Sequence, residues 1–236
     1  MTIPRFSECQ HALVEALADC SDEDLLQQFQ EQSQSSGRYF VALFCRYGSL
    51  VYSLIQHAPS APTAAESPIE SYGGAEAMGV SPDYRFAQIW KQLYSDLQNL
   101  DLSETSGMPE TSTLLSSADA ALAAPLTLQN WIVDYTARYI RRNEPEPGGD
   151  RYSLTYAPPP LWCYLEQSLE QLPPLHRLVV VLHRTFGWPL DEVRTYLSSK
   201  GTDMDIAAVI TLLEEGFHLI DANLPEDIQA IYLSPS

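Results

Sequence analysis

The chain has 236 residues, of which 45% are hydrophobic, and this is enough apolar material for one large or two small packed cores. Its formal net charge of −18 excludes unspecific binding of the whole surface to nucleic-acid phosphates or anionic lipids, because like charges repel. The chain has no run that reaches the roughly 18 apolar residues of a membrane span and no basic-then-apolar signal pattern at its N-terminus, so we expect a cytoplasmic protein without a membrane segment.

The first sixty residues predict three helices. Ser7 and Ser21 are each followed three residues later by a polar partner, as in a capping box, so we expect helices to begin there. A third helix is expected over residues 38–57, with Gly48 weakening its middle. Its apolar residues recur at helical spacing: Phe40, Leu43, Phe44, Tyr47, Leu50, Val51 and Leu54.

Two segments interrupt the helical pattern. Residues 58–82 contain four prolines and a Gly-Gly pair but no Lys or Arg, and residues 101–124 are rich in Ser, Thr and Ala. Such compositions bury too little apolar surface to offset the entropy of ordering. We therefore expect two mobile insertions and not separate domains.

A helix predicted between the insertions, at about 83–100, has six apolar residues on one side: Phe86, Ile89, Trp90, Leu93, Tyr94 and Leu97. The next helix follows a cap at Thr127 and ends in arginines. Three aromatics lie four residues apart on one face: Trp131, Tyr135 and Tyr139. Arg138 and Arg142 occupy an adjacent stripe, and Arg141 stands with Arg142 at the end of the helix. These residues suit a platform on which single-stranded bases stack and phosphates pair. Alternatively, the aromatics face a core and the arginines suit the negative end of the helix dipole.

The C-terminal third predicts a second helical domain. Residues 143–160 contain five prolines and a Gly-Gly pair, which is typical of a linker. Beyond it we expect an amphipathic helix, a Pro-Pro break, an apolar helix ending at Gly187, a short helix opened by Pro189, and a helix over about 203–222. A final helix is opened by Pro225. The prediction is an all-α fold with two small domains, residues 1–142 and 161–236, the second with a helix-turn-helix-like arrangement.

Catalytic and metal-binding patterns are not found. The cysteines have no C-x-x-C spacing, so we expect four small buried thiols, without a disulfide or a zinc site: Cys9, Cys20, Cys45 and Cys163. The five histidines are scattered, and neither a phosphate-binding glycine loop nor a nucleophile motif occurs. We expect a binding protein that is not an enzyme and has no metal or cofactor.

Four segments, taken in order, resemble the compact two-domain bacterial RNA polymerase sigma factors of the sigma-70 family, called extracytoplasmic-function-like. The pattern "L…RYG..VY" of the promoter-melting domain matches at Leu43, Arg46, Tyr47, Gly48, Val51 and Tyr52. FAQIWKQLY occupies the place of the polymerase-binding helix, with Gln88 at the family's glutamine. NWIVDYTARYIRR is similar to the family's "aWL…IARN…RR" helix at Trp131, Ile132, Arg141 and Arg142. The pattern "L..LP…R.V..L….G.s..EIA..L" matches at Leu172, Pro173, Arg177, Val179, Leu182, Gly187, Glu192, Val193 and Leu197.

The resemblance implies binding to core RNA polymerase through the helix with Arg85, Gln88 and Gln92, and contact with single-stranded promoter DNA through the aromatic-arginine helix. Arg85 and Ile89 stand where the family usually has acidic residues, which implies an altered polymerase contact. Gln88 has an alternative reading as an ordinary exposed glutamine.

The last predicted domain departs most from the family. No Lys or Arg follows Lys200, and Asp203 and Asp205 stand at the start of the helix that would read duplex DNA. We therefore do not expect duplex recognition. The apolar positions of this helix predict that it is largely buried: Ile206, Val209, Ile210, Leu213, Phe217 and Ile220.

Two hypotheses follow for the function. The first is a sigma-factor-like transcription initiation protein with weakened or lost promoter recognition. The second is a degenerate sigma relative that acts as an acidic adaptor or regulator for a basic protein partner, without binding DNA.

Overall fold

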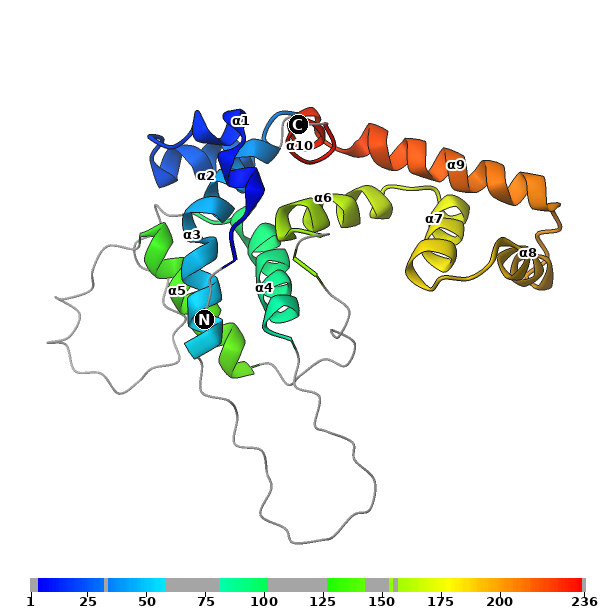
Figure 1. Cartoon of the computed structure of the whole chain (residues 1–236), viewed down its shortest axis with the longest axis horizontal. Coiled ribbons are helices and arrows are strands. Elements are labelled where there is room, and N and C mark those ends of the chain that lie inside the picture. Colours follow the sequence, from blue (N-terminus) through cyan, green and yellow to red (C-terminus); the bar gives the residue numbers. More distant parts are fainter. Residues whose placement is uncertain are drawn as a thin grey trace, which may run out of the picture. The chain divides into compact units, whose positions relative to one another are not determined.

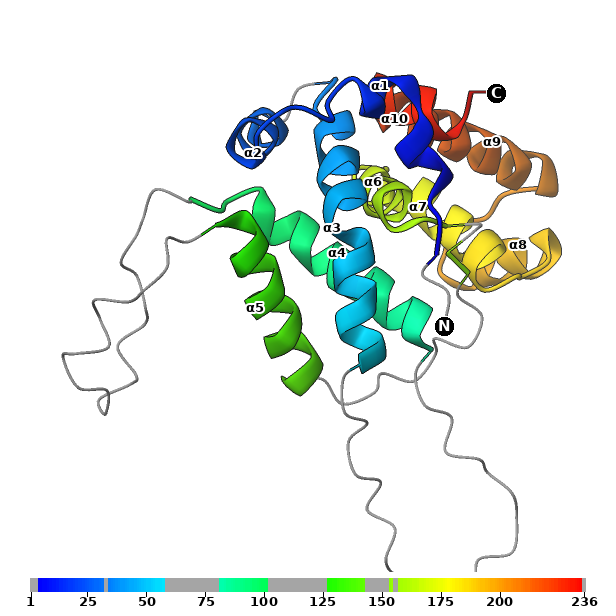
Figure 2. The same cartoon turned by 60° about the vertical axis from the view of Figure 1, so that its left-hand side comes forward.

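The computed structural model describes residues 4–31, 34–57, 81–101, 127–142, 153–154 and 157–234 (Figure 1 and Figure 2). Within these ranges the chain forms helices and turns and no β-strand, so the prediction of an all-α fold is confirmed. The α-helices are α1 (Ala12–Glu15), α2 (Asp22–Gln30), α3 (Gly37–His57), α4 (Pro82–Leu97), α5 (Leu128–Arg142), α6 (Pro159–Glu170), α7 (Pro174–Val180), α8 (Leu190–Ser199), α9 (Ile206–Asn223) and α10 (Glu226–Tyr232). The predicted insertions at 58–82 and 101–124, and the linker at 143–160, lie almost entirely outside the described residues.

The chain divides into two compact units. Unit 1 comprises Met1–Glu31 and Tyr39–Pro160, and unit 2 comprises Gln32–Arg38 and Leu161–Ser236. The sequence pattern did not predict that residues just before Tyr39 would group with the C-terminal region.

Unit 1 has an aromatic core between α3 and α4, and α5 lies beside them (Figure 1 and Figure 2). The fully buried ring of Trp90 meets Phe44 edge to face at a centroid distance of 4.9 Å, and meets Phe40 in the same way at 6.0 Å. Such pairs contribute roughly 0.5–1.5 kcal/mol beyond the burial of their area. The helices predicted at 38–57 and about 83–100 are confirmed, because these large apolar residues recur at helical spacing.

The first predicted helix differs from the structure. The residues from Ser7 to Gln10 form a 3₁₀ turn, and Ser7 lies inside this turn, so the capping box predicted there is wrong. The N-cap residue of α1 is His11, whose Nδ1 accepts a hydrogen bond from the Leu13 N–H at 3.3 Å. At Ser21 the prediction is confirmed, because its hydroxyl oxygen accepts the N–H of Asp24 at 3.1 Å and α2 begins there.

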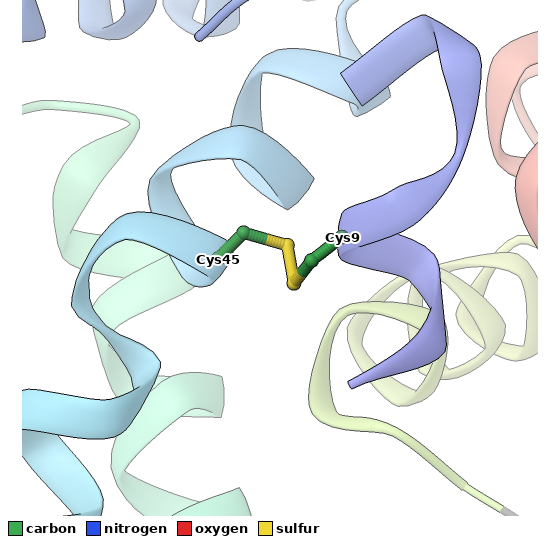
Figure 3. Close-up of a disulfide and its surroundings, with 2 residues drawn as sticks. All are labelled: Cys9 and Cys45. Atoms are coloured by element: carbon green, nitrogen blue, oxygen red, sulfur yellow. A yellow bond between two sulfur atoms is a disulfide. The ribbon is translucent and has the colours of Figure 1, made fainter. Parts of the chain in front are cut away.

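A disulfide joins Cys9, in the N-terminal 3₁₀ turn, to Cys45, in α3, with the Cα atoms 5.5 Å apart (Figure 3). The prediction of four free thiols is therefore wrong for this pair. Cys163 is a buried free thiol as predicted, whereas the free Cys20 is only half-buried. The pair is 36 residues apart without a motif, and the packing of Phe6 in the aromatic core is what brings the turn to α3.

Unit 2 follows the predicted order of helices. The Pro-Pro break separates α6 from α7, and α7 runs into a π-helical turn at Val181–Thr185. Gly187 then adopts a positive φ of 68°, a conformation that glycine takes without steric cost, and α8 follows Pro189. Helix α9 packs on α7 and α8, and α10 follows Pro225 as predicted.

The buried side of α9 is narrower than predicted. Its buried residues recur at spacings of four, three and four: Val209, Leu213, Gly216 and Ile220. Ile206 and Ile210 are 37% and 39% exposed, so the prediction of a largely buried helix is wrong for these two positions. The reason is that only one side of α9 meets other helices, and both isoleucines lie at its edge.

The C-terminal helix α10 caps the start of α3 within unit 2. Oδ2 of Asp227 accepts a hydrogen bond from the Arg38 N–H at 2.7 Å, across 189 positions of sequence. A Cβ on Gly37 would lie 2.5 Å from Ile228, so only glycine admits this approach. Asp227 is buried, and this burial raises the pKa of its carboxyl, although the backbone hydrogen bonds act in the opposite direction.

Candidate nucleic-acid and polymerase-binding surface

Helix α5 is capped as predicted and packs on α4. Thr127 Oγ1 accepts the N–H of Asn130 at 3.2 Å. Its fully buried side chains are spaced by four residues: Leu128, Ile132 and Thr136. The three candidate aromatics flank this row and are half-buried: Trp131, Tyr135 and Tyr139. They are therefore neither simple core residues nor an open stacking platform.

Tyr135 is held against α4. Burial raises the pKa of the Tyr135 hydroxyl, and the hydrogen bond that it donates to the Asp96 carboxylate raises it further. The ring of Trp131 lies beside that of Tyr135, with centroids 5.2 Å apart and planes inclined by 32°. A nucleic-acid base could therefore stack only on the exposed part of this fixed pair.

Two of the three candidate arginines are described and exposed. The Nε–H of Arg138 donates to the carbonyl of Asp134 at 3.3 Å, and that of Arg141 donates to the carbonyl of Ala137 at 3.1 Å. Neither carbonyl is among the last four of α5, so these bonds do not cap the end of the helix. They leave both guanidinium groups in a position to meet a phosphate. The side chain of Arg142 lies outside the described residues.

The three candidate residues of α4 lie on the side of the helix away from its buried aromatics, by helical spacing. Arg85 and Gln88 are half-buried, and Gln92 is exposed. Gln88 Nε2 donates to the Tyr84 hydroxyl at 2.7 Å, so this glutamine is held in one orientation. Asp96, the partner of Tyr135, follows Gln92 by one helical turn.

The Tyr135–Asp96 contact thus joins the two predicted sites into one surface. We call it the α4–α5 surface and define it by Arg85, Gln88, Gln92, Trp131, Tyr135, Arg138 and Arg141. The sequence predicted its members separately, and their adjacency comes from the packing of α4 on α5.

Helix α9 presents a different outward side. Its first N–H groups are capped by Asp205, whose Oδ1 accepts the Ala208 N–H at 2.8 Å. Between Ile206 and Asn223 it has no Lys or Arg, and its outward side carries isoleucines and carboxylates. Arg and Lys, the side chains that most often pair with phosphates and with guanine edges in a duplex, are therefore missing from this helix.

The Arg-Tyr-Gly motif of α3 binds the start of α2 and the loop before it, a role that the sequence pattern did not predict. Arg46 Nη1 forms an ion pair with Asp22 at 2.5 Å, and its Nη2 donates to the carbonyl of Cys20 at 2.9 Å. The Tyr47 hydroxyl donates to the same carboxylate, and the pKa of Tyr47 is raised by burial and then by this bond. The motif marked both side chains, but nothing in the sequence marked Asp22 as their partner. These residues hold the loop before α2.

Among the described ranges, no three or more His, Cys, Asp or Glu side chains gather where they could hold a metal ion. None of the helices in the part of the chain that the structure describes is both long and apolar enough to cross a membrane.

We compared the chain with models of protein families, with curated proteins and with solved structures. None of these three comparisons gave a match. The interpretation of the α4–α5 surface therefore depends on the side chains themselves.

Proposed function

We propose that the chain is a sigma-factor-like transcription initiation protein that binds core RNA polymerase and has weakened or lost promoter recognition. The observation that carries this proposal is the α4–α5 surface, where polar groups of α4 adjoin the aromatic and arginine groups of α5 through Tyr135 and Asp96. In the resemblance, the first group meets the polymerase and the second meets the melted DNA strand. The activity is binding without chemistry, in the cytoplasm.

The local charge of the α4–α5 surface supports this assignment. In a chain with a net charge of −18, Arg85, Arg138 and Arg141 put three cations on two adjacent helices. Each phosphate neutralised by such a cation adds salt-dependent affinity. A base stacked on Trp131 adds roughly 1–3 kcal/mol. Single-stranded DNA would thus bind at this surface, while the rest of the protein repels it.

A second candidate function is the adaptor without DNA binding, and α9 favours it. The outward side of this helix carries exposed apolar and acidic residues where a duplex-reading helix needs donors. An acidic surface of this kind suits a basic protein partner. Under this hypothesis the two helical units are kept as a scaffold.

A pull-down of core RNA polymerase with the full-length protein separates the two functions. We expect the wild type to bind and Arg85→Glu to bind about tenfold more tightly, because the substitution restores the acidic residue that the family usually has at this contact. Arg5→Glu is the matched control, since Arg5 is exposed and lies outside the α4–α5 surface. If the wild type does not retain core polymerase, the sigma-like function is wrong and the adaptor function is left.

Binding of a fluorescent single-stranded oligonucleotide tests the DNA contact, alone and with core polymerase. Arg138→Ala with Arg141→Ala should abolish binding or lower the slope of log affinity against log salt by about 1.4, which corresponds to two phosphate contacts. Arg5→Ala with Arg177→Ala changes the net charge equally and should have little effect, and Asp203→Ala should have none. An unchanged affinity in the Arg138/Arg141 variant would leave these side chains without a role in binding DNA.

A further inference from the structure

The outward side of α9 carries two exposed apolar side chains that do not contribute to the buried core of unit 2. Ile206 and Ile210 are one helical turn apart, so they lie on the same side of the helix, and they are 37% and 39% exposed. The buried seam next to them is already filled by α7 and α8. The two side chains therefore form an apolar spot in solvent.

The same side continues as an acidic row toward the end of α9. Glu214 follows Ile210 by one turn, and Asp221 follows two turns later; both are exposed. Among the described residues neither carboxylate has a side-chain partner, in contrast to Glu215, which lies 3.0 Å from His176. The negative end of the helix dipole lies at this end and adds to the attraction for cations.

We infer that this outward side of α9 binds a basic amphipathic helix of another protein. The row from Ile206 to Asp221 spans sixteen residues, or about 22 Å, which one partner helix of similar length would cover. Its apolar residues would cover Ile206 and Ile210, and its Lys or Arg residues would pair with Glu214 and Asp221. The inference rests on the adaptor form of the proposed function, for which binding of a basic helix at α9 names both the surface and the partner. For the polymerase-binding form, the basic helix is a second partner besides the polymerase.

Charge decides between a basic helix and the other possible occupants. A second copy of this chain would bring a net charge of −18 and the same carboxylates, so the two faces would repel each other. Duplex DNA and anionic membranes are repelled for the same reason. A basic helix is attracted by the carboxylates and covers the isoleucines at the same time.

The probe is a synthetic amphipathic Leu/Lys helix of about fifteen residues, in which the leucines lie along one side and the lysines flank them. Its binding to the full-length protein is measured by fluorescence anisotropy. A peptide of the same composition, scrambled so that no side is amphipathic, controls for the overall charge. We expect the amphipathic helix to bind at least about tenfold more tightly, with a strong salt dependence, because only it can bury both isoleucines. Equal binding of the two peptides would overturn the inference, since net charge alone would then explain the attraction.

Matched variants locate the site. Ile206→Ser with Ile210→Ser should lose about tenfold or more in affinity, while Leu219→Ser, equally exposed but on the other side of the seam, should not. Glu214→Gln with Asp221→Asn should lower the affinity and its salt dependence more than Glu15→Gln with Asp19→Asn, an exposed acidic pair in unit 1. If Ile206/Ile210 and Leu219 variants behave alike, the surface is wrong.

The two proposals can fail independently. The Ile206/Ile210 variant should retain core polymerase as the wild type does, because α4 is unchanged. Loss of peptide binding with intact polymerase binding supports the α9 site. Wild type that binds polymerase but not the amphipathic helix contradicts the inference and leaves the sigma-like function standing.

Discussion

Two glycines inside long helices, Gly48 in unit 1 and Gly216 in unit 2, show how differently the two units are built. A Cβ on Gly48 would lie 3.5 Å from the ring of Phe6, which is ordinary van der Waals contact. A Cβ on Gly216 would lie 2.7 Å from Cγ2 of Val180, which is closer than real Cβ atoms come. In unit 1 aromatic rings separate the helices, whereas in unit 2 α7 and α9 approach so closely that glycine is needed. The same residue type is therefore a local weakness of helix α3 and a packing contact of helix α9.

The units also differ in how distant segments are held. Unit 1 fastens its N-terminal segment to α3 by the Cys9–Cys45 disulfide and by the Arg46–Asp22 ion pair. Within the described residues of unit 2 there is no disulfide, and the packing of α9 on α7 and α8 holds the helices together instead. Removing the disulfide should thus lower the stability of unit 1, and disturbing the packing of α9 on α7 should lower the stability of unit 2.

Removing the disulfide should have the largest effect. Cys9→Ala with Cys45→Ala opens a loop of 36 residues, and loop-closure entropy predicts a loss of about 3–4 kcal/mol in the free energy of unfolding. Hydrogen exchange resolved by segment should place the loss in α1–α4 and leave α7–α9 unchanged. Cys20→Ala is the control, because Cys20 is already a free thiol.

Reduction of the wild type gives an independent measure of the same quantity. A dithiol should destabilise the wild type as the double variant is destabilised, and should leave the double variant unaffected. In a reducing cytoplasm, which the sigma-like function implies, the pair would be held as two thiols. Equal stability of the oxidised and reduced protein would mean that Phe6 and Arg46 alone hold the segment.

Gly216→Ala should have the next largest effect, on unit 2. Overpacking against Val180 typically costs about 1–3 kcal/mol, against which alanine regains up to about 1 kcal/mol of helix propensity. We expect a net loss of about 1–2 kcal/mol in chemical denaturation. Adding Val180→Ala should recover part of it, because that change removes the atom that the new methyl group meets. If the double variant lost more free energy of unfolding than the two single variants lose together, the close contact between Gly216 and Val180 would be contradicted.

Asp227→Ala should cost about 1–2 kcal/mol, as the loss of an N-cap usually does, because the Arg38 N–H loses its acceptor. The pKa of Asp227 is raised in the folded state, so the folded protein binds its proton more tightly than the unfolded chain does. Its contribution to stability is therefore fully present below the unfolded pKa and is lost as the pH rises through the folded pKa. The variant should thus be destabilised more in acid than at neutral pH, as measured by denaturation at both. The opposite trend would mean that the hydrogen bonds outweigh burial.

Much of the fold could be predicted because local signals agreed with it. The aromatic spacing of residues 38–57 and the caps at Ser21 and Thr127 are properties of neighbouring residues, and the structure has both. The disulfide and the cap by Asp227 could not be predicted, because they join residues 36 and 189 positions apart whose meeting depends on packing.

The candidate site was predictable residue by residue but not as an arrangement. Periodicity showed that Trp131 and Tyr135 share a side of α5, but it did not show that Asp96 holds Tyr135. For α9, periodicity predicted which side of the helix is buried. It did not predict how many residues on that side are covered, because the neighbouring helices determine this. Ile206 and Ile210 are exposed for that reason.

Gly48→Ala should have the smallest effect and the opposite sign. An alanine inside a helix stabilises it by roughly 0.5–1 kcal/mol relative to glycine, since the unfolded chain loses freedom and the helix gains a compatible residue. The new methyl group would meet the rings of Phe6 and Phe44 at 3.5 and 3.8 Å, so no neighbour has to move. Thermal unfolding should therefore shift upward, with Ser49→Ala as the control at an exposed neighbouring position. Gly48 is also part of the Arg-Tyr-Gly match to the sigma factors, so the same variant separates stability from function. If the variant is more stable but no longer retains core polymerase, the glycine serves binding and not folding.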